Sequence, residues 1–151
     1  MRPTRHPAGQ RGAMLLELAL VLPFLILILL LVLECTQLVR THVVLNNAAR
    51  EGARLSVVKE NQEDLPDKVR IPEIKDQVVA YASQNHVTIT RDDINIDQAV
   101  PVTMPAGYGA MTASQVTITY TYTLNYLKAF TWLGVPGSYA LQGSAEFRNF
   151  Y

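Results

Sequence analysis

The chain has 151 residues, with 13 Lys and Arg against 13 Asp and Glu, so its formal net charge is zero. Three of the 13 basic residues precede Ala13, which leaves 10 basic against 13 acidic residues in the rest and disfavours nucleic-acid binding there. Cys35 is the only cysteine, so an intrachain disulfide is excluded.

Residues 1–12 form a short basic segment with no acid, and two prolines interrupt it; its basic residues are Arg2, Arg5 and Arg11. We expect no stable fold in so short a segment. It is interpreted either as a cytoplasmic tail or as a basic leader that is removed. No pattern of small residues suited to a secretory cleavage follows the apolar run, so a cut would fall before it.

Residues 13–33 are apolar apart from Glu17, and they contain one proline, Pro23. These 21 residues would span roughly 31 Å as a helix, which matches a hydrocarbon core of about 30 Å. The pattern therefore predicts a transmembrane helix, and the basic segment before it predicts a cytoplasmic N-terminus. Glu17 needs a separate explanation, because a carboxylate inside a membrane is costly.

The sequence Gly-Ala-Met-Leu-Leu-Glu at residues 12–17 resembles the processing site of type IV prepilins. Two further stretches narrow the resemblance: Ala-Leu-Val-Leu-Pro at residues 19–23 and Asn-Ala-Ala-Arg-Glu-Gly-Ala-Arg at residues 47–54. Together they are similar to the TadE-like minor pilins of tight-adherence (Flp) pilus systems. The similarity extends over about residues 11–58.

This resemblance implies that a prepilin peptidase cuts after Gly12 and that Ala13 becomes the mature N-terminus. Glu17, then the fifth residue, would neutralise the α-amino group of a neighbouring subunit during assembly. The alternative is that Glu17 simply lies among lipid head groups. The further partners implied are the major Flp pilin, other minor pilins, the assembly platform of the bacterial inner membrane and the lipid bilayer.

Residues 34–58 predict a continuation of the helix, with Leu38, His42, Leu45 and Ala49 on one packed face. Pro23 predicts a kink in the membrane-spanning part, a feature that also recurs in pilin helices. Small residues around Gly52 would let another helix or a sheet approach closely. Two charged residues beside them are candidates for partner contacts, with a solvated surface as the alternative: Arg50 and Arg54.

Residues 59–151 predict a small domain outside the membrane. Residues 59–70 are expected to form a loop, residues 72–85 a short helix that begins at Pro72, and residues 94–100, 116–124 and 139–147 an antiparallel sheet with one buried face. Residues 101–111 and 128–138 are predicted connections, and Trp132 is expected to pack in the core or its loop rather than act as an exposed anchor. The fold class is therefore α+β and pilin-like, with a long N-terminal helix on the sheet.

No motif for catalysis or phosphate binding occurs in the sequence, and the three histidines are far apart. We predict no cofactor, no metal site and no enzymatic activity. The sequence favours a minor pilin (pseudopilin) that supports Flp pilus assembly. The alternatives are an unprocessed, single-pass periplasmic binding module and a membrane-tethered enzyme, for which no residue can be nominated.

Overall fold

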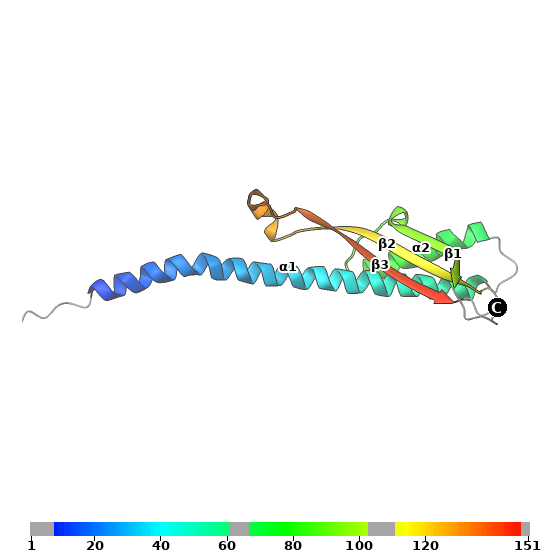
Figure 1. Ribbon diagram of the computed structural model, residues 1–151, viewed down its shortest axis with the longest axis horizontal. Coiled ribbons are helices and arrows are strands. Elements are labelled where there is room, and N and C mark those ends of the chain that lie inside the picture. The colour runs from blue at the N-terminus through cyan, green and yellow to red at the C-terminus, as the bar shows by residue number, and fades with distance from the viewer. Residues whose placement is uncertain (1–7, 61–66, 103–110, 149–151) are drawn as a thin grey trace, which may run out of the picture. The chain divides into compact units, whose positions relative to one another are not determined.

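The computed structural model describes residues 8–60, 67–102 and 111–148. The first helix, α1, spans Ala8–Glu60, and the second, α2, spans Asp67–Gln84. Three strands follow, β1 (Ile94–Val102), β2 (Met111–Thr123) and β3 (Ser138–Arg148), with short 3-10 helices η1 (Arg91–Asp93) before β1 and η2 (Leu127–Leu133) before β3. The predicted α+β fold, with a long helix, one short helix and a three-stranded sheet, is confirmed (Figure 1).

Several element boundaries differ from the prediction. α1 begins at Ala8, five positions before Ala13, and α2 begins at Asp67, so Pro72 lies inside this helix and not at its start. A proline inside a helix removes one backbone hydrogen bond. The buried side chains that follow it, Ile74 and Val78, hold α2 in place regardless. Most of the predicted connection at residues 101–111 and part of the one at residues 59–70 lie outside the described residues.

The chain divides into two compact units. The first unit contains the described residues up to Thr36 together with Leu124–Gly137, and the second contains Gln37–Thr123 and the residues from Ser138 onward. α1 therefore contributes residues to both units. The segment Leu124–Gly137 includes η2, and it groups with the apolar part of α1 although the 87 residues Gln37–Thr123 lie between the two in the sequence.

The sheet of the second unit is antiparallel, with β2 between β1 and β3. Ile118 lies at its centre, opposite Ile94 on one side and Gly143 on the other. β1 is an edge strand, which explains how Pro101 can lie within it: the missing N–H need not bond to a neighbouring strand. The predicted alternation along β2 is confirmed, since Val116, Ile118 and Tyr122 are all buried.

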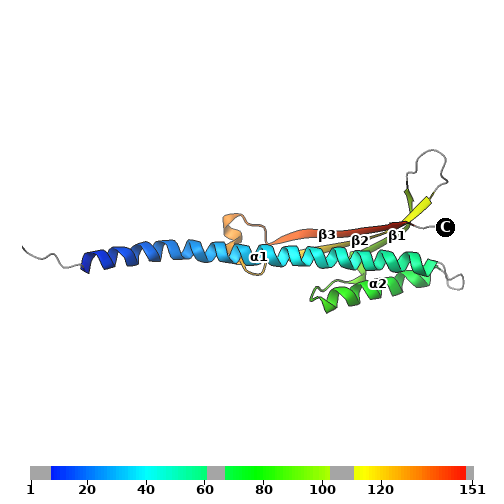
Figure 2. The same ribbon diagram turned by 90° about the horizontal axis from the view of Figure 1, so that it is seen from below.

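The core of this unit lies between one face of the sheet and the helices, which occupy the same side of it (Figure 2). Its fully buried residues come from the second part of α1, from α2 and from β2: Leu45, Ala48, Ala49, Ala53, Ile74, Val78, Ala82, Val116 and Ile118. The predicted packed face of α1 is partly wrong, because His42 is exposed. The buried stripe passes through Thr41 and Leu45 and continues along the small residues to Ser56, which leaves His42 beside it.

Two glycines allow the closest approaches in this core. A Cβ atom added at Gly143 of β3 would lie 2.7 Å from the carbonyl carbon of Leu45 and 2.8 Å from its oxygen. A Cβ at Gly52 of α1 would lie 2.6 Å from Val78 Cγ2 and 3.4 Å from Val116 Cγ1. α2 and β2 can therefore approach α1 at Gly52, and β3 can approach α1 at Gly143, only because these two residues have no side chain. The close approach at Gly52 agrees with the prediction from the small residues around it.

Candidate functional site

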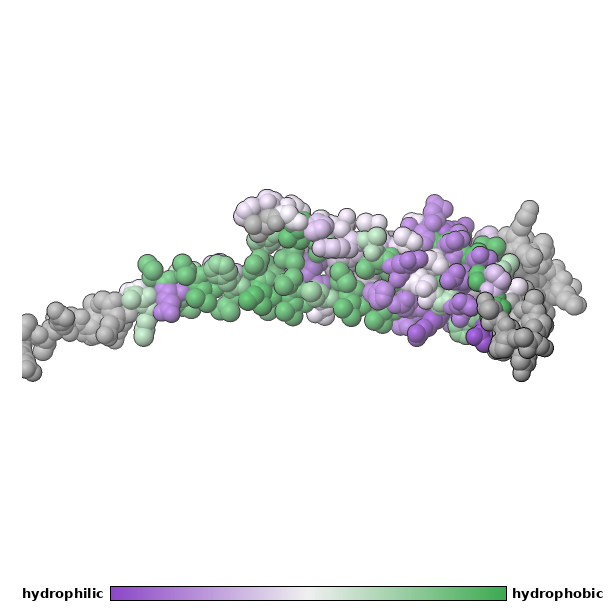
Figure 3. Space-filling view, viewed as in Figure 1, coloured by the Kyte–Doolittle hydropathy of each residue, from purple (hydrophilic) through white to green (hydrophobic). Residues whose placement is uncertain are grey.

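The first part of α1 presents a continuous apolar surface. From Gly12 to Leu33 every side chain is exposed except that of Leu30, which is half-buried. Figure 3 shows this as an extended green surface along the helix, whereas purple, hydrophilic side chains gather over the second unit. The helix between Gly12 and Val57 is long and apolar enough to cross a membrane. These properties fit a single-pass membrane protein, because water does not favour so large an apolar surface.

The predicted processing residues lie on this exposed surface. A Cβ atom at Gly12 would meet no other atom within 4 Å, and Gly12 does not have a positive φ. Neither packing nor backbone conformation therefore requires a glycine at this position. Ala13 and Glu17 follow on the same helix, and Glu17 lines a shallow hollow with Met14, Leu18 and Val21.

Glu34 is the one acidic side chain of the first unit that the structure buries among the described residues, at 2% exposure. Its carboxylate accepts hydrogen bonds from three successive backbone N–H groups: Asn125 at 3.1 Å, Tyr126 at 2.7 Å and Leu127 at 3.2 Å. Glu34 therefore fastens the start of η2 to α1, at the end of the apolar run.

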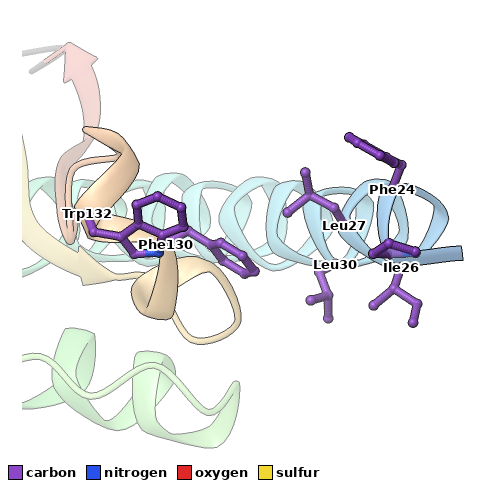
Figure 4. Close-up of a pocket in the computed structure, with 7 residues that line it drawn as sticks. Phe24, Ile26, Leu27, Leu30, Phe130 and Trp132 are labelled. Atoms are coloured by element: carbon purple, nitrogen blue, oxygen red, sulfur yellow. The ribbon is translucent and has the colours of Figure 1, made fainter. Parts of the chain in front are cut away.

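An apolar pocket lies beside this attachment. Phe130 and Trp132 of η2 line it together with residues of α1 (Figure 4), which are Pro23, Phe24, Ile26, Leu27 and Leu30. Trp132 is 77% exposed, so the expected place in the core is wrong for this residue. Its ring stays on the surface because η2 is a short segment that turns sharply at its C-cap, Gly134, whose φ is +82°.

The remaining predicted site residues lie in different places. Pro23 lies inside α1, so the helix continues past this proline. Pro23 also lines the apolar pocket. Arg50 and Arg54 are exposed in the second unit, where Arg54 bonds to Glu51 through Nη2 at 2.7 Å and Nε at 3.1 Å. Gly52 is buried beside Val78 and Val116 of the same unit. Gly12, Ala13 and Glu17 therefore lie within two turns of one helix in the first unit, whereas Arg50, Gly52 and Arg54 belong to the second unit.

The ion pair between Glu51 and Arg54 shifts the titration of both groups. The hydrogen bond from Arg54 lowers the pKa of Glu51 below its ordinary value of 4.5, and desolvation opposes this only in part. The same hydrogen bond raises the pKa of Arg54. Both side chains remain more than one third exposed, at 37% and 54%, so solvent screens the interaction.

Sequence reasoning missed the role of Glu34 and the attachment of η2. The signal available was an acidic residue directly after an apolar run, but nothing in the sequence linked it to residues 91 to 93 positions later. Within residues 8–60, 67–102 and 111–148, no group of three or more His, Cys, Asp or Glu side chains is arranged to hold a metal ion. Cys35 is an exposed free thiol.

Residues 12–54 match the family model described as TadE-like protein. This confirms the resemblance predicted from the processing site, the apolar run and the small-residue cluster. No curated protein and no solved structure matches the chain. The match covers 43 of the 151 residues, and all of them lie in α1.

Proposed function

We propose that the chain is a minor pilin (pseudopilin) that supports assembly of a tight-adherence pilus after a prepilin peptidase cuts behind Gly12. Before assembly, α1 holds it in the bacterial inner membrane, with the N-terminus in the cytoplasm and the C-terminal domain in the periplasm. The observation that carries this proposal is the match over residues 12–54, because it includes the predicted processing residues Gly12, Ala13 and Glu17 together with the exposed apolar part of the helix.

The surroundings of Gly12 support a role in processing. This glycine lies within α1, in open space, and without a positive φ. A glycine inside a helix costs about 1 kcal/mol relative to alanine. The cost is not returned by packing here, so the reason for a glycine lies outside the folded chain. A weakened helix at residue 12 also helps a peptidase to straighten the backbone that it cuts.

Glu17 supports the assembly role. It is exposed on a helix whose other side chains from Ala13 to Leu33 are apolar. Cleavage creates an α-amino cation at Ala13, and two opposite charges in an apolar layer each reduce the desolvation cost of the other. Because Glu17 is exposed on its own subunit, its carboxyl group is accessible to the Ala13 amino group of another subunit, which is the partner we propose.

The test is mass spectrometry of the intact protein isolated from cells that contain the peptidase. A chain that begins at Ala13 is expected. Gly12→Val should leave Met1 in place, because a branched side chain at the residue before the cut blocks access while the surrounding space is empty. Gly137→Ala is the matched control, since a Cβ there meets only ordinary contact with Thr131 at 3.8 Å. An intact Met1 in the unaltered protein contradicts the proposal.

A second experiment separates the pilin from an unprocessed, single-pass periplasmic binding module, for which the exposed apolar helix would serve as an anchor alone. Glu17→Leu makes the helix wholly apolar from residue 13 to residue 33. A simple anchor should insert at least as well and lose nothing. A minor pilin should still be inserted and cut but should no longer support pili, which electron microscopy of the cells would reveal.

A further inference from the structure

We propose that Leu124–Gly137 is a second membrane contact, in which η2 inserts Phe130 and Trp132 into the lipid leaflet that faces the C-terminal domain, beside α1. This inference rests on the membrane anchoring in the proposed function and adds a second element to it. The occupant of the apolar pocket is then the acyl chains of the bilayer.

The depth of the pocket along α1 is the first argument. Its α1 residues are Pro23 to Leu30, and all of them belong to the apolar run that ends at Leu33. At about 1.5 Å per residue, they lie roughly 5–15 Å inside that end. If the run fills a hydrocarbon core of about 30 Å, η2 overlies the outer half of the membrane-spanning segment. It cannot keep this position without meeting lipid.

The composition of the segment Leu124–Gly137 is the second argument. Trp132 is 77% exposed and Tyr126 is 43% exposed, whereas Phe130 is half-buried toward the pocket. Tryptophan and tyrosine are enriched at membrane interfaces, where an apolar ring meets hydrocarbon and a polar group reaches the head groups. Lys128 is exposed on the same segment, and its long side chain can extend to the phosphate layer.

The backbone of the segment is the third argument, because unpaired N–H groups are costly in hydrocarbon. Glu34 accepts the N–H groups of Asn125, Tyr126 and Leu127. The two ends of the segment are joined by a hydrogen bond of 3.1 Å from Leu124 N–H to the Gly137 oxygen, and Gly134 N–H donates to the Thr131 oxygen at 3.0 Å. Glu34 thus satisfies donors that would otherwise oppose insertion, and it stands one residue beyond the apolar run.

The test uses the full-length chain reconstituted in phosphatidylcholine vesicles, because Trp132 is its only tryptophan and reports without any substitution. We expect a blue-shifted emission that loses most of its intensity when the acyl chains carry bromine, and that dissolved iodide quenches little. Emission that iodide quenches and bromine does not would overturn the proposal. Emission that neither quencher reduces, and that becomes open to quenching when the chain is diluted in lipid, would mean that a second copy of the chain fills the pocket. This result would overturn the proposal equally.

Two controls separate this inference from the proposed function. Vesicle flotation first shows whether the chain is inserted. A chain that does not float contradicts both the anchor and the contact of η2, whereas a chain that floats with Trp132 in water contradicts the latter alone. Glu34→Ala should free η2 and move Trp132 from bromine quenching toward iodide quenching. Glu17→Ala removes the same kind of side chain from the same helix without touching η2 and should leave the quenching unchanged.

Discussion

The two parts of α1 differ in what determines their sequence. From Gly12 to Leu33 the side chains are apolar apart from Glu17 and almost all exposed, so their chemistry is matched to surroundings outside the chain. From Thr41 to Ser56 the buried stripe consists mainly of small residues, and it is matched to α2 and the sheet. The first part of the helix is therefore constrained by its surroundings outside the chain, and the second part by packing within the chain. Substitutions of glycine, glutamate and serine residues can distinguish these two constraints.

The largest expected effect is that of Gly143→Ala. The added Cβ would lie 2.7–2.8 Å from backbone and side-chain atoms of Leu45, and a backbone cannot move aside cheaply. Overpacking costs about 1–3 kcal/mol and occasionally more, and we expect the upper end here. Thermal unfolding of the full-length chain in detergent, followed by circular dichroism, should show a clearly lowered Tm.

Gly12→Ala is the matched control for that variant, since it adds the same methyl group in open space. Its Tm should be unchanged or slightly higher, because alanine favours a helix by about 1 kcal/mol over glycine. Equal losses of stability in the two variants would show that the first part of α1 is as closely packed as the second, and would contradict the difference between the two parts described above.

The next largest effect is expected from Glu34→Ala, which tests the boundary between the two parts of α1. The substitution removes the acceptor of three backbone N–H groups, and an unsatisfied buried donor costs about 1–3 kcal/mol. We expect faster amide hydrogen exchange at residues 125–127, with little change in β2 or the core. Unchanged exchange at these amides would mean that Glu34 does not hold η2, and Glu17→Ala should give that result.

Much of the fold could be predicted because it rests on local patterns. The apolar run, the alternation of Val116 and Ile118 with threonines, and the small residues around Gly52 each indicate their element without knowledge of the rest. Boundaries were harder, as at α2, where the packing of Ile74 and Val78 outweighs the proline that suggested a helix start.

The candidate site was predictable only in part, for a related reason. Gly12, Ala13 and Glu17 are close in sequence, so their pattern is readable directly and the family match covers them. Glu34 bonds to amides 91 to 93 positions away, and backbone N–H groups carry no sequence signature. Trp132 was expected to pack in the core or its loop rather than to be an exposed anchor, whereas in η2 its side chain is 77% exposed.

A smaller effect is expected from Ser56→Ala, which tests the polar part of the buried stripe. Ser56 Oγ accepts hydrogen bonds from Ser114 Oγ at 2.7 Å and from Gln98 Nε2 at 3.0 Å, and both serines are fully buried. Loss of the acceptor should cost about 1–2 kcal/mol in denaturant unfolding. Ser83→Ala, on the exposed side of α2, should change stability by less than about 0.5 kcal/mol. Equal effects would contradict a specific role for Ser56.

The smallest effect belongs to the outer face of the same helix segment. Arg54 lowers the pKa of Glu51 below 4.5, so this pair stabilises the folded chain above that pH and its contribution is lost as pH falls through the lower folded-state value. Both groups are well exposed, so Glu51→Gln should lower the Tm only slightly at pH 7, less so at high salt and not at all at low pH. Arg54→Gln and the double variant should show the same small loss. A loss as large as that of Gly143→Ala would mean that the solvent-facing side of α1, and not its packed stripe, holds the second unit together.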